Sequence, residues 1–230
     1  MARLPRLALT GQAHLVALHG HSGQPVFIDD DDRRNFLAAL RESALQHAVA
    51  VHAYVLLDNH VHLLLTPATG AALGALMQGL GRRYGAGFNR RHGRQGTLWA
   101  GRFRATVVQA GANVLDAMLF IDHHPVRTGA VLLAQDHAWS SARQHLGLLR
   151  DSLITEAGAW WALGNTPFER EAAYRRLLDD GLSAGRVAQL TEAGHKGWPV
   201  GDSQFLSGLA LQTSRPVQPR RRGRPAGPLA

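Results

Sequence analysis

The sequence contains no cysteine and only one lysine among its 230 residues. Without cysteine, neither a disulfide nor a thiolate-bound zinc site can form, which suits a reducing compartment such as the cytoplasm. No unbroken apolar run reaches the roughly 18 residues of a membrane-spanning helix. The N-terminal stretch is too short for a signal peptide and is interrupted by Pro5 and Gly11. We therefore expect a cytoplasmic protein with no membrane partner.

Arginine supplies almost all of the positive charge. Lysine and arginine total 25, so 24 are arginine once Lys196 is subtracted, and the net charge is +8. A guanidinium group can bind two phosphate oxygens at once, which favours a nucleic-acid surface. A coding bias toward arginine, alanine and glycine explains the same composition without any binding role. Charge alone leaves both interpretations open.

Apolar periodicity predicts an α+β domain. Short apolar runs indicate strands, and apolar residues at helical spacing indicate helices. The predicted order is strand, helix, strand, strand, helix, strand, helix, over residues 13–19, 31–48, 49–57, 60–66, 70–91, 103–109 and 112–124. With the two long helices on one face of an antiparallel sheet, this order is a ferredoxin-like split βαβ arrangement. We interpret the acidic run 29–32 as the capped first turn of a helix, not as a metal site.

Three regions follow from the composition along the chain. Residues 1–135 form the α+β domain, and residues 136–214 form a partly helical C-terminal extension with helical spacing over 168–194. Residues 215–230 are rich in proline, glycine and arginine, a composition typical of a disordered basic tail.

Two histidines interrupt the apolar stretch LLDNHVHLLLTP. Side chains at positions i and i+2 of a strand share a face, so His60 and His62 can bind one metal ion. The alternative is a pair of histidines hydrogen-bonded on the sheet surface, since buried polar groups need partners. A second pair, His19 and His21, lies in a turn-rich region, and we interpret it as a chance pair among 13 histidines.

An arginine block covers residues 82–104, with seven arginines and no acidic residue. Arginine attracts the phosphate backbone, and interleaved aromatic rings can stack on unpaired bases. The alternative is a solvated basic loop whose aromatic residues belong to the core, and we expect Tyr84, Phe88 and Phe103 to be at least partly buried. The candidate DNA-binding residues of the chain are Arg82, Arg83, Asn89, Arg90, Arg91, Arg94, Trp99, Arg102, Arg104 and Arg127.

The end of the last predicted helix of the domain carries a further candidate. Phe120 and His124 are four residues apart and therefore share a helical face. His124 is a candidate third metal ligand. The alternative is a helix C-terminus where histidine interacts with the dipole and Pro125 stops the helix.

Long stretches of the sequence resemble the single-tyrosine HUH transposases, and among them the REP-associated tyrosine transposases of bacteria. The similarity covers roughly residues 1–225 and combines NHVHLLLTP with the arginine block, a highly specific pair of motifs. The similar stretches, in the order of that family, are MARLPRLAL, QPVFIDDDD, HAYVLLDNHVHLLLTP, FNRRHGRQGTLWAGRFRA, HHPVRTG, WSS, GWPVGDSQF and RRRGRP.

The resemblance implies a catalytic and DNA-binding domain that acts on single-stranded or hairpin DNA of a repeated element. It implies a bacterial, nucleoid-associated protein that is a monomer or a homodimer. It also implies Mg²⁺ or Mn²⁺ held by the HUH histidines, here His60 and His62. In the family, a helix tyrosine attacks a phosphodiester polarised by the metal, which leaves a 5′-phosphotyrosine and a free 3′-OH.

The sequence departs from the family at the nucleophile. The family pattern Y-I-E-x-N-P-V-R reads FIDHHPVR here, so Phe120 holds the tyrosine position and has no oxygen to attack with. His124 replaces an Asn or Gln ligand, and three imidazoles shift metal preference toward Mn²⁺, Zn²⁺ or similar ions. Three functions stay open: an active transposase, a non-catalytic DNA-binding relative, and a nuclease using metal-bound water. Tyr84, beside the arginine block, is the candidate substitute nucleophile; the other tyrosines are Tyr54 and Tyr174.

Overall fold

A four-stranded antiparallel sheet forms the centre of the protein. The structure is a computed structural model that describes residues 6–218. The strands lie in the order β2-β3-β1-β4, which is the order of a ferredoxin-like split βαβ sheet. Their bounds are β1 (Ala13–His19), β2 (Val49–Leu57), β3 (His60–Pro67) and β4 (Arg104–Val108). The predicted fold class is confirmed.

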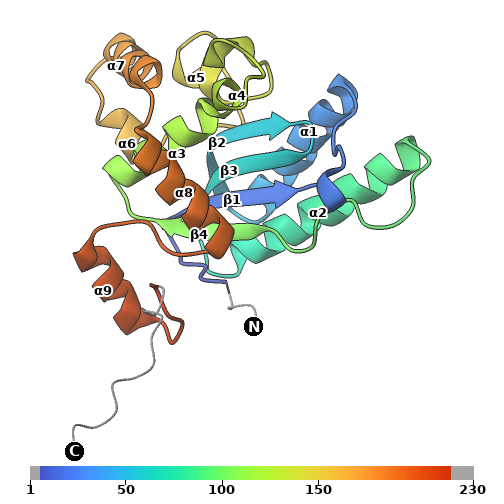
Figure 1. Cartoon of the computed structure of the whole chain (residues 1–230), viewed down its shortest axis with the longest axis horizontal. Coiled ribbons are helices and arrows are strands. Elements are labelled where there is room, and N and C mark those ends of the chain that lie inside the picture. Colours follow the sequence, from blue (N-terminus) through green and yellow to red (C-terminus); the bar gives the residue numbers. More distant parts are fainter. Residues whose placement is uncertain (1–5, 219–230) are drawn as a thin grey trace, which may run out of the picture.

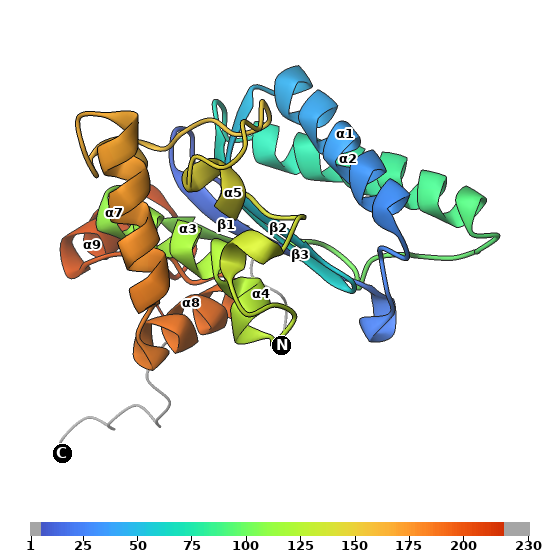
Figure 2. The ribbon, with the colours of Figure 1, turned by 90° about the horizontal axis from the view of Figure 1, so that it is seen from above.

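Two long helices cover one face of the sheet, as the sequence predicts. They are α1 (Asp30–Gln46) and α2 (Ala72–Arg91), and Figure 2 shows them side by side. Phe36 of α1 and Leu76 of α2 are fully buried against alternate strand residues such as Leu63. The carboxylate of Asp29 accepts a hydrogen bond from the backbone N–H of Asp32 at 3.0 Å. This bond confirms the acidic run as a helix cap.

A third helix, α3 (Ala112–Asp122), covers the opposite face of the sheet (Figures 1 and 2). It packs on the other set of alternate strand residues, including Leu15, Val55 and Leu64. The sequence analysis placed helices on one face only. The apolar character of the whole segment 49–57 already indicated a strand buried on both faces.

The C-terminal extension adds short helices around α3 (Figure 1). Its single predicted helix is two helices, because Gly181 adopts a φ of +66° where the first one ends. Pro125 lies in the first turn of a new short helix, where proline is tolerated. The helices are α4 (His124–Arg127), α5 (Ala142–His145), α6 (Gly158–Trp161), α7 (Pro167–Asp180), α8 (Ala184–Lys196) and α9 (Ser203–Gln212), with 3₁₀ turns at His21–Gly23 and Ala134–Asp136.

The expected basic tail begins within the described residues. Arg215 is buried, and its guanidinium donates to the carbonyl of Gly197. Residues 1–5 and 219–230, with the start of MARLPRLAL and the RRRGRP stretch, lie outside the described residues. Across residues 6–218, no helix combines the length and the hydropathy needed to cross a bilayer.

Candidate functional site

Three histidines meet where β3 faces the end of α3. His60 and His62 project from the α3-covered face of β3, and His124 begins α4 directly after α3. Their candidate ligand nitrogens all lie within 4.8 Å of one another. The Nε2 atoms of His60 and His124 are 2.7 Å apart. The fold thus brings together all three histidines that the sequence nominates as metal ligands.

Burial keeps these three imidazoles neutral. It lowers the pKa of His60 to about 4, aided by the charge of His19, and it lowers the pKa of His124 to about 3, aided by Arg127. Burial also holds the pKa of His62 well below its ordinary value. A metal ion binds neutral imidazole through a free lone pair, so the cluster has the protonation state that a metal requires.

Two hydrogen-bonding features fit a metal ion at this cluster. The buried Nδ1 of His62 has no hydrogen-bond partner among residues 6–218, although a buried nitrogen normally has one. The Nδ1 of His60 donates to the side-chain oxygen of Asn59 at 2.7 Å, which leaves its Nε2 as the lone-pair atom. Metal-bound histidines in proteins are commonly oriented by such an outer acceptor.

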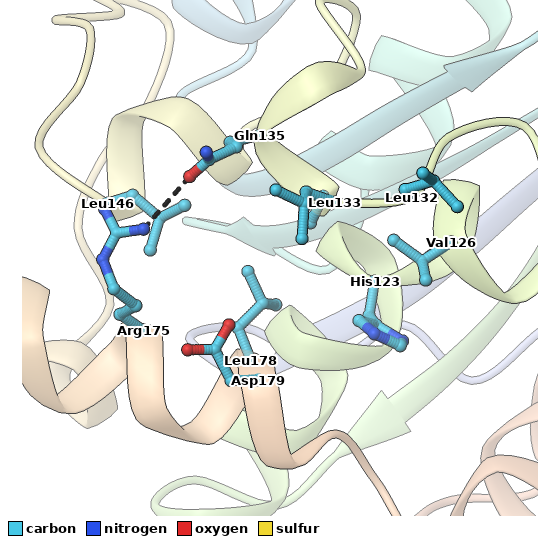
Figure 3. A pocket seen from close by; sticks show the side chains of 10 residues that line it. His123, Val126, Leu132, Leu133, Gln135, Leu146, Arg175, Leu178 and Asp179 are labelled. Atoms are coloured by element: carbon cyan, nitrogen blue, oxygen red, sulfur yellow. Dashed lines mark hydrogen bonds between the residues drawn. The ribbon is translucent and has the colours of Figure 1, made fainter.

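The adjacent histidine, His123, belongs to a different place. It lines a cavity of about 240 Å³ between the α3–α4 turn, the segment around residues 132–135 and α7 (Figure 3). At the rim, Arg175 donates to the side-chain oxygen of Gln135 at 3.0 Å. The sequence analysis nominated His124 of this pair, and the structure places His124 with His60 and His62.

Phe120 lies beside the cluster and is buried. Its ring centroid is 5.7 Å from that of His62 and 6.0 Å from that of His124. The guanidinium of Arg127 lies over the Phe120 ring, 4.4 Å from its centroid. Phenylalanine has no hydroxyl, so the side chain at this position supplies no nucleophile.

All three tyrosines lie within the described residues and are hydrogen-bonded elsewhere. The hydroxyl of Tyr54 donates to Asp151 at 2.8 Å, and that of Tyr174 donates to Asp122 at 2.7 Å. The hydroxyl of Tyr84 donates to the carbonyl of Val26 at 2.5 Å, in the core on the α1–α2 face. Tyr84 is therefore on the wrong face of the sheet, and its candidacy as a substitute nucleophile is wrong.

A buried polar cluster anchors the end of α3 to the C-terminal extension. The carboxylate of Asp122 accepts from the hydroxyl of Ser141 at 2.6 Å, from Nδ1 of His145 at 2.6 Å and from the hydroxyl of Tyr174 at 2.7 Å. The other nitrogen of His145 faces the carbonyl of His52 at 3.0 Å, so the ring donates from both nitrogens. This cluster joins α3, α5 and α7 two residues before His124. The sequence analysis missed it, because its members are distant in sequence.

His19 also lies next to the metal-ligand candidates. Strand register pairs His19 with His60, and their rings stack at 5.6 Å with an angle of 11°. His195 of α8 stacks on His19 at 6.1 Å, and Arg104 donates to His195. A cavity of about 70 Å³ lies between these side chains and His62. The sequence analysis interpreted His19 as part of a chance pair and missed its place beside His60, because that place depends on which strand lies next to β3. His21, the other member of that pair, is exposed.

Several arginines of the block are free at the surface. Arg82, Arg90 and Arg102 are exposed, and no ion pair involves them in the described part of the chain. The other polar candidates have internal partners. Arg83 pairs with Glu42, Arg94 donates to Gln24, Asn89 donates to the carbonyl of Gly96, and Arg127 donates to the carbonyl of Phe120.

Arg91 ties the end of α2 to the start of α1. Its guanidinium pairs with Asp29 at 2.7 Å and with Asp32 at 2.6 Å. It also pairs with Asp31 at 3.2 Å. The sequence analysis considered Arg91 a DNA contact and the acidic run a cap alone. The fold places the two next to each other, so the guanidinium is already neutralised within the protein.

Trp99 is a core residue. It is 8% exposed, and its ring packs against Phe36 at 6.3 Å and Tyr84 at 6.0 Å. Its assignment to DNA binding needs correction, because a buried ring is not free to stack on a base. Phe88 is also buried and Phe103 is partly buried, as predicted.

Comparison with known proteins assigns the α+β domain. A family model described as transposase, IS200 like, matches residues 10–122. This match makes the α+β domain similar to the IS200-like transposases. The matched segment runs from the residues before β1 to the last residue of α3. It therefore includes His60, His62 and Phe120 and ends two residues before His124.

A solved structure shares the fold of the α+β domain. A REP-associated tyrosine transposase bound to a REP hairpin is 14% identical, with a TM-score of 0.56, over 68% of this chain and 98% of that one. A candidate transposase from Deinococcus radiodurans R1 is 20% identical, with a TM-score of 0.35, over 56% and 94% of the two chains. A search of curated proteins gives no significant match.

Proposed function

We propose that this protein binds single-stranded or hairpin DNA at a divalent-metal centre of the transposase type and forms no tyrosine adduct. One observation carries this proposal: three neutral imidazoles converge beside Phe120 instead of beside a tyrosine. The similarity of the domain to the IS200-like transposases and to a REP-associated tyrosine transposase bound to a REP hairpin supports DNA as the partner.

The ligands of the proposed centre are His60, His62 and His124. Mg²⁺ or Mn²⁺ is the family's ion, and a set of three nitrogen donors favours Mn²⁺ or Zn²⁺ over Mg²⁺. A bound divalent ion would polarise a DNA phosphate. The protein's own contribution is to hold the imidazoles neutral and to orient His60 through Asn59.

The proposed DNA surface centres on the exposed arginines Arg82, Arg90 and Arg102. They are free of internal ion pairs in the described chain, so their guanidinium groups can contact phosphate without first breaking a bond within the protein. Arg83 and Arg94 are also candidates, at the cost of their contacts with Glu42 and Gln24.

A second candidate function is metal-dependent hydrolysis of DNA. The cavity of about 70 Å³ beside His62 and His124 has room for a water molecule. In this reaction water attacks the phosphorus, one P–O bond breaks, and the departing oxygen takes up a proton. No covalent link to the protein forms, so the absence of a tyrosine would not block it.

One assay separates these functions: a panel of single-stranded hairpin oligonucleotides is incubated with the protein and Mn²⁺. Binding without cleavage supports the proposed function. Cleavage without a covalent adduct supports hydrolysis, and a protein–DNA adduct contradicts the proposal. The variant with both His60→Ala and His62→Ala is the control, because any cleavage that persists in it does not come from this centre.

A further inference from the structure

A chain of hydrogen bonds runs through the histidine cluster to Arg127. The Nη2 of Arg127 lies 2.9 Å from Nδ1 of His124, and Nε2 of His124 lies 2.7 Å from Nε2 of His60. The Nδ1 of His60 lies 2.7 Å from the side-chain oxygen of Asn59. Three contacts in sequence thus connect a cation, two imidazoles and an amide oxygen.

The two ends of this chain set its direction. Arginine only donates, so Nδ1 of His124 accepts and its ring proton lies on Nε2. That Nε2 donates to Nε2 of His60, whose own proton lies on Nδ1 and is donated to Asn59. Every contact then joins one donor to one acceptor.

This arrangement conflicts with a metal ion at His124. An ion bound to Nε2 requires the lone pair there, so the ring proton must move to Nδ1. The Nδ1–H would then face the N–H of Arg127, which cannot accept it. The two Nε2 atoms must also separate, because two nitrogens at roughly 2.1 Å from one ion lie about 3 Å or more apart.

We propose that Arg127 competes with the metal ion for His124, so that ligation by His124 requires the guanidinium to move away. Among the described residues, no arginine donates to His60 or His62. Asn59 favours the metal-binding tautomer of His60, whose Nε2 accepts from His124 itself, and the buried Nδ1 of His62 is unpartnered. This inference rests on the proposed metal centre and adds a residue that controls how completely the centre is assembled.

A released Arg127 becomes available to DNA. Its guanidinium also donates to the carbonyl of Phe120 at 2.6 Å and lies over the Phe120 ring, so it is next to both His124 and the position of the family's nucleophile. A phosphate group at the centre would attract it away from His124. Metal binding and phosphate binding should then strengthen each other by the same factor, as linkage requires.

The test is calorimetric titration of the full chain with Mn²⁺. Arg127→Met removes the competing donor, and we expect Mn²⁺ affinity to rise by about tenfold or more. Removal of a positive charge contributes part of that rise. Arg104→Met is the matched charge control, because Arg104 lines the cavity beside His62 and His124 and donates to His195, not to a candidate ligand. The rise in Mn²⁺ affinity for Arg104→Met should be clearly smaller than that for Arg127→Met.

A double-mutant cycle assigns the effect to His124. In a His124→Ala background, Arg127→Met should produce only the small rise seen with Arg104→Met. Nitrogen NMR of the metal-free wild type should show the His124 proton on Nε2, and the Zn²⁺-loaded protein should show it on Nδ1. Thermal melts establish that each variant is folded.

Separate outcomes distinguish this inference from the proposed function. Equal rises for Arg127→Met and Arg104→Met, or a full rise that persists without His124, overturn the competition and leave the metal centre intact. Failure of both the wild type and Arg127→Met to bind Mn²⁺ overturns the metal centre and the competition together. Hairpin DNA binding without metal would then still stand.

Discussion

The ring of Phe120 meets the ring of His62 edge to face, with 5.7 Å between their centroids. A hydrocarbon edge therefore occupies the place beside the candidate metal ligands where the family resemblance implies a nucleophilic hydroxyl. We therefore expect the residue at position 120 to decide whether this site can form a covalent link to DNA.

Phe120→Tyr restores that oxygen. We expect the variant to form a covalent adduct with single-stranded hairpin DNA in the presence of Mn²⁺, while the wild type forms none. Denaturing gel electrophoresis of labelled DNA measures the adduct. The same substitution combined with His62→Ala is the control and should give no adduct. If Phe120→Tyr binds hairpin DNA and Mn²⁺ but never becomes linked, the site is not otherwise intact.

Asn59→Ala removes the acceptor that orients His60. Loss of an outer partner of a metal-bound histidine typically lowers metal affinity by about 10- to 100-fold. We expect a decrease in Mn²⁺ affinity within that range by calorimetric titration. Asn165→Ala, at an exposed position far along the chain, is the control and should leave affinity unchanged. An unchanged affinity in Asn59→Ala would contradict His60 as an Nε2 ligand.

Tyr174→Phe removes one of three donors to buried Asp122. We expect a loss of about 2 kcal/mol in the free energy of unfolding, because the hydroxyl donates to a charged acceptor in a dry environment. Tyr54→Phe is the comparison, because its hydroxyl donates to the carboxylate of Asp151, which is partly exposed. We expect this variant to lose about 1 kcal/mol in the free energy of unfolding. Urea unfolding measures both. A larger loss for Tyr54→Phe would disprove the anchoring role of Asp122.

Buried His14 makes the fold sensitive to acid. Burial lowers its pKa to about 4. Its Nδ1 donates to the carbonyl of Gln12 at 2.8 Å, and its Nε2 accepts from the N–H of Leu9 at 3.2 Å. This arrangement needs the neutral ring.

Between pH 6.5 and 4 the unfolded chain takes up a proton at this position and the folded chain does not, so stability falls as pH falls through that window. We expect His14 to contribute about 3 kcal/mol of that loss. His14→Gln, which cannot be protonated, should show a flatter pH dependence in urea unfolding. Identical pH profiles for wild type and variant would contradict a buried neutral His14.

Arg90 and Arg91 are neighbours with different surroundings, which makes them a matched pair. Arg90 is exposed without an internal ion pair, whereas Arg91 pairs with Asp29 and Asp32. Arg90→Ala should weaken DNA binding and reduce the dependence of log affinity on log salt by roughly 0.7 to 0.9. Arg91→Ala should mainly lower the melting temperature. Fluorescence anisotropy at several salt concentrations measures the DNA affinity of both variants. Equal salt slopes for Arg90→Ala and wild type would exclude Arg90 from the DNA surface.

Local patterns determined the helices and strands of the α+β domain. Alternation and apolar runs predicted β1 and β2 to the residue, and they placed His60 and His62 on one side of a strand. The cap at Asp29 followed from acidic residues before a helical repeat. These features depend on neighbours within a few residues, which the chain carries with it before any tertiary contact forms.

Only the tertiary structure decided which distant residues meet. The sequence nominated His124, but the packing of α3 on the second face of the sheet brings it to His60. Strand order alone places His19 beside the cluster, and the packing of α1 and α2 on the other face of the sheet buries Trp99 and neutralises Arg91. The physical reason is that strand register, and the face of the sheet on which each helix packs, determine which side chains meet across the core. Neither can be read from the composition or periodicity of a single segment.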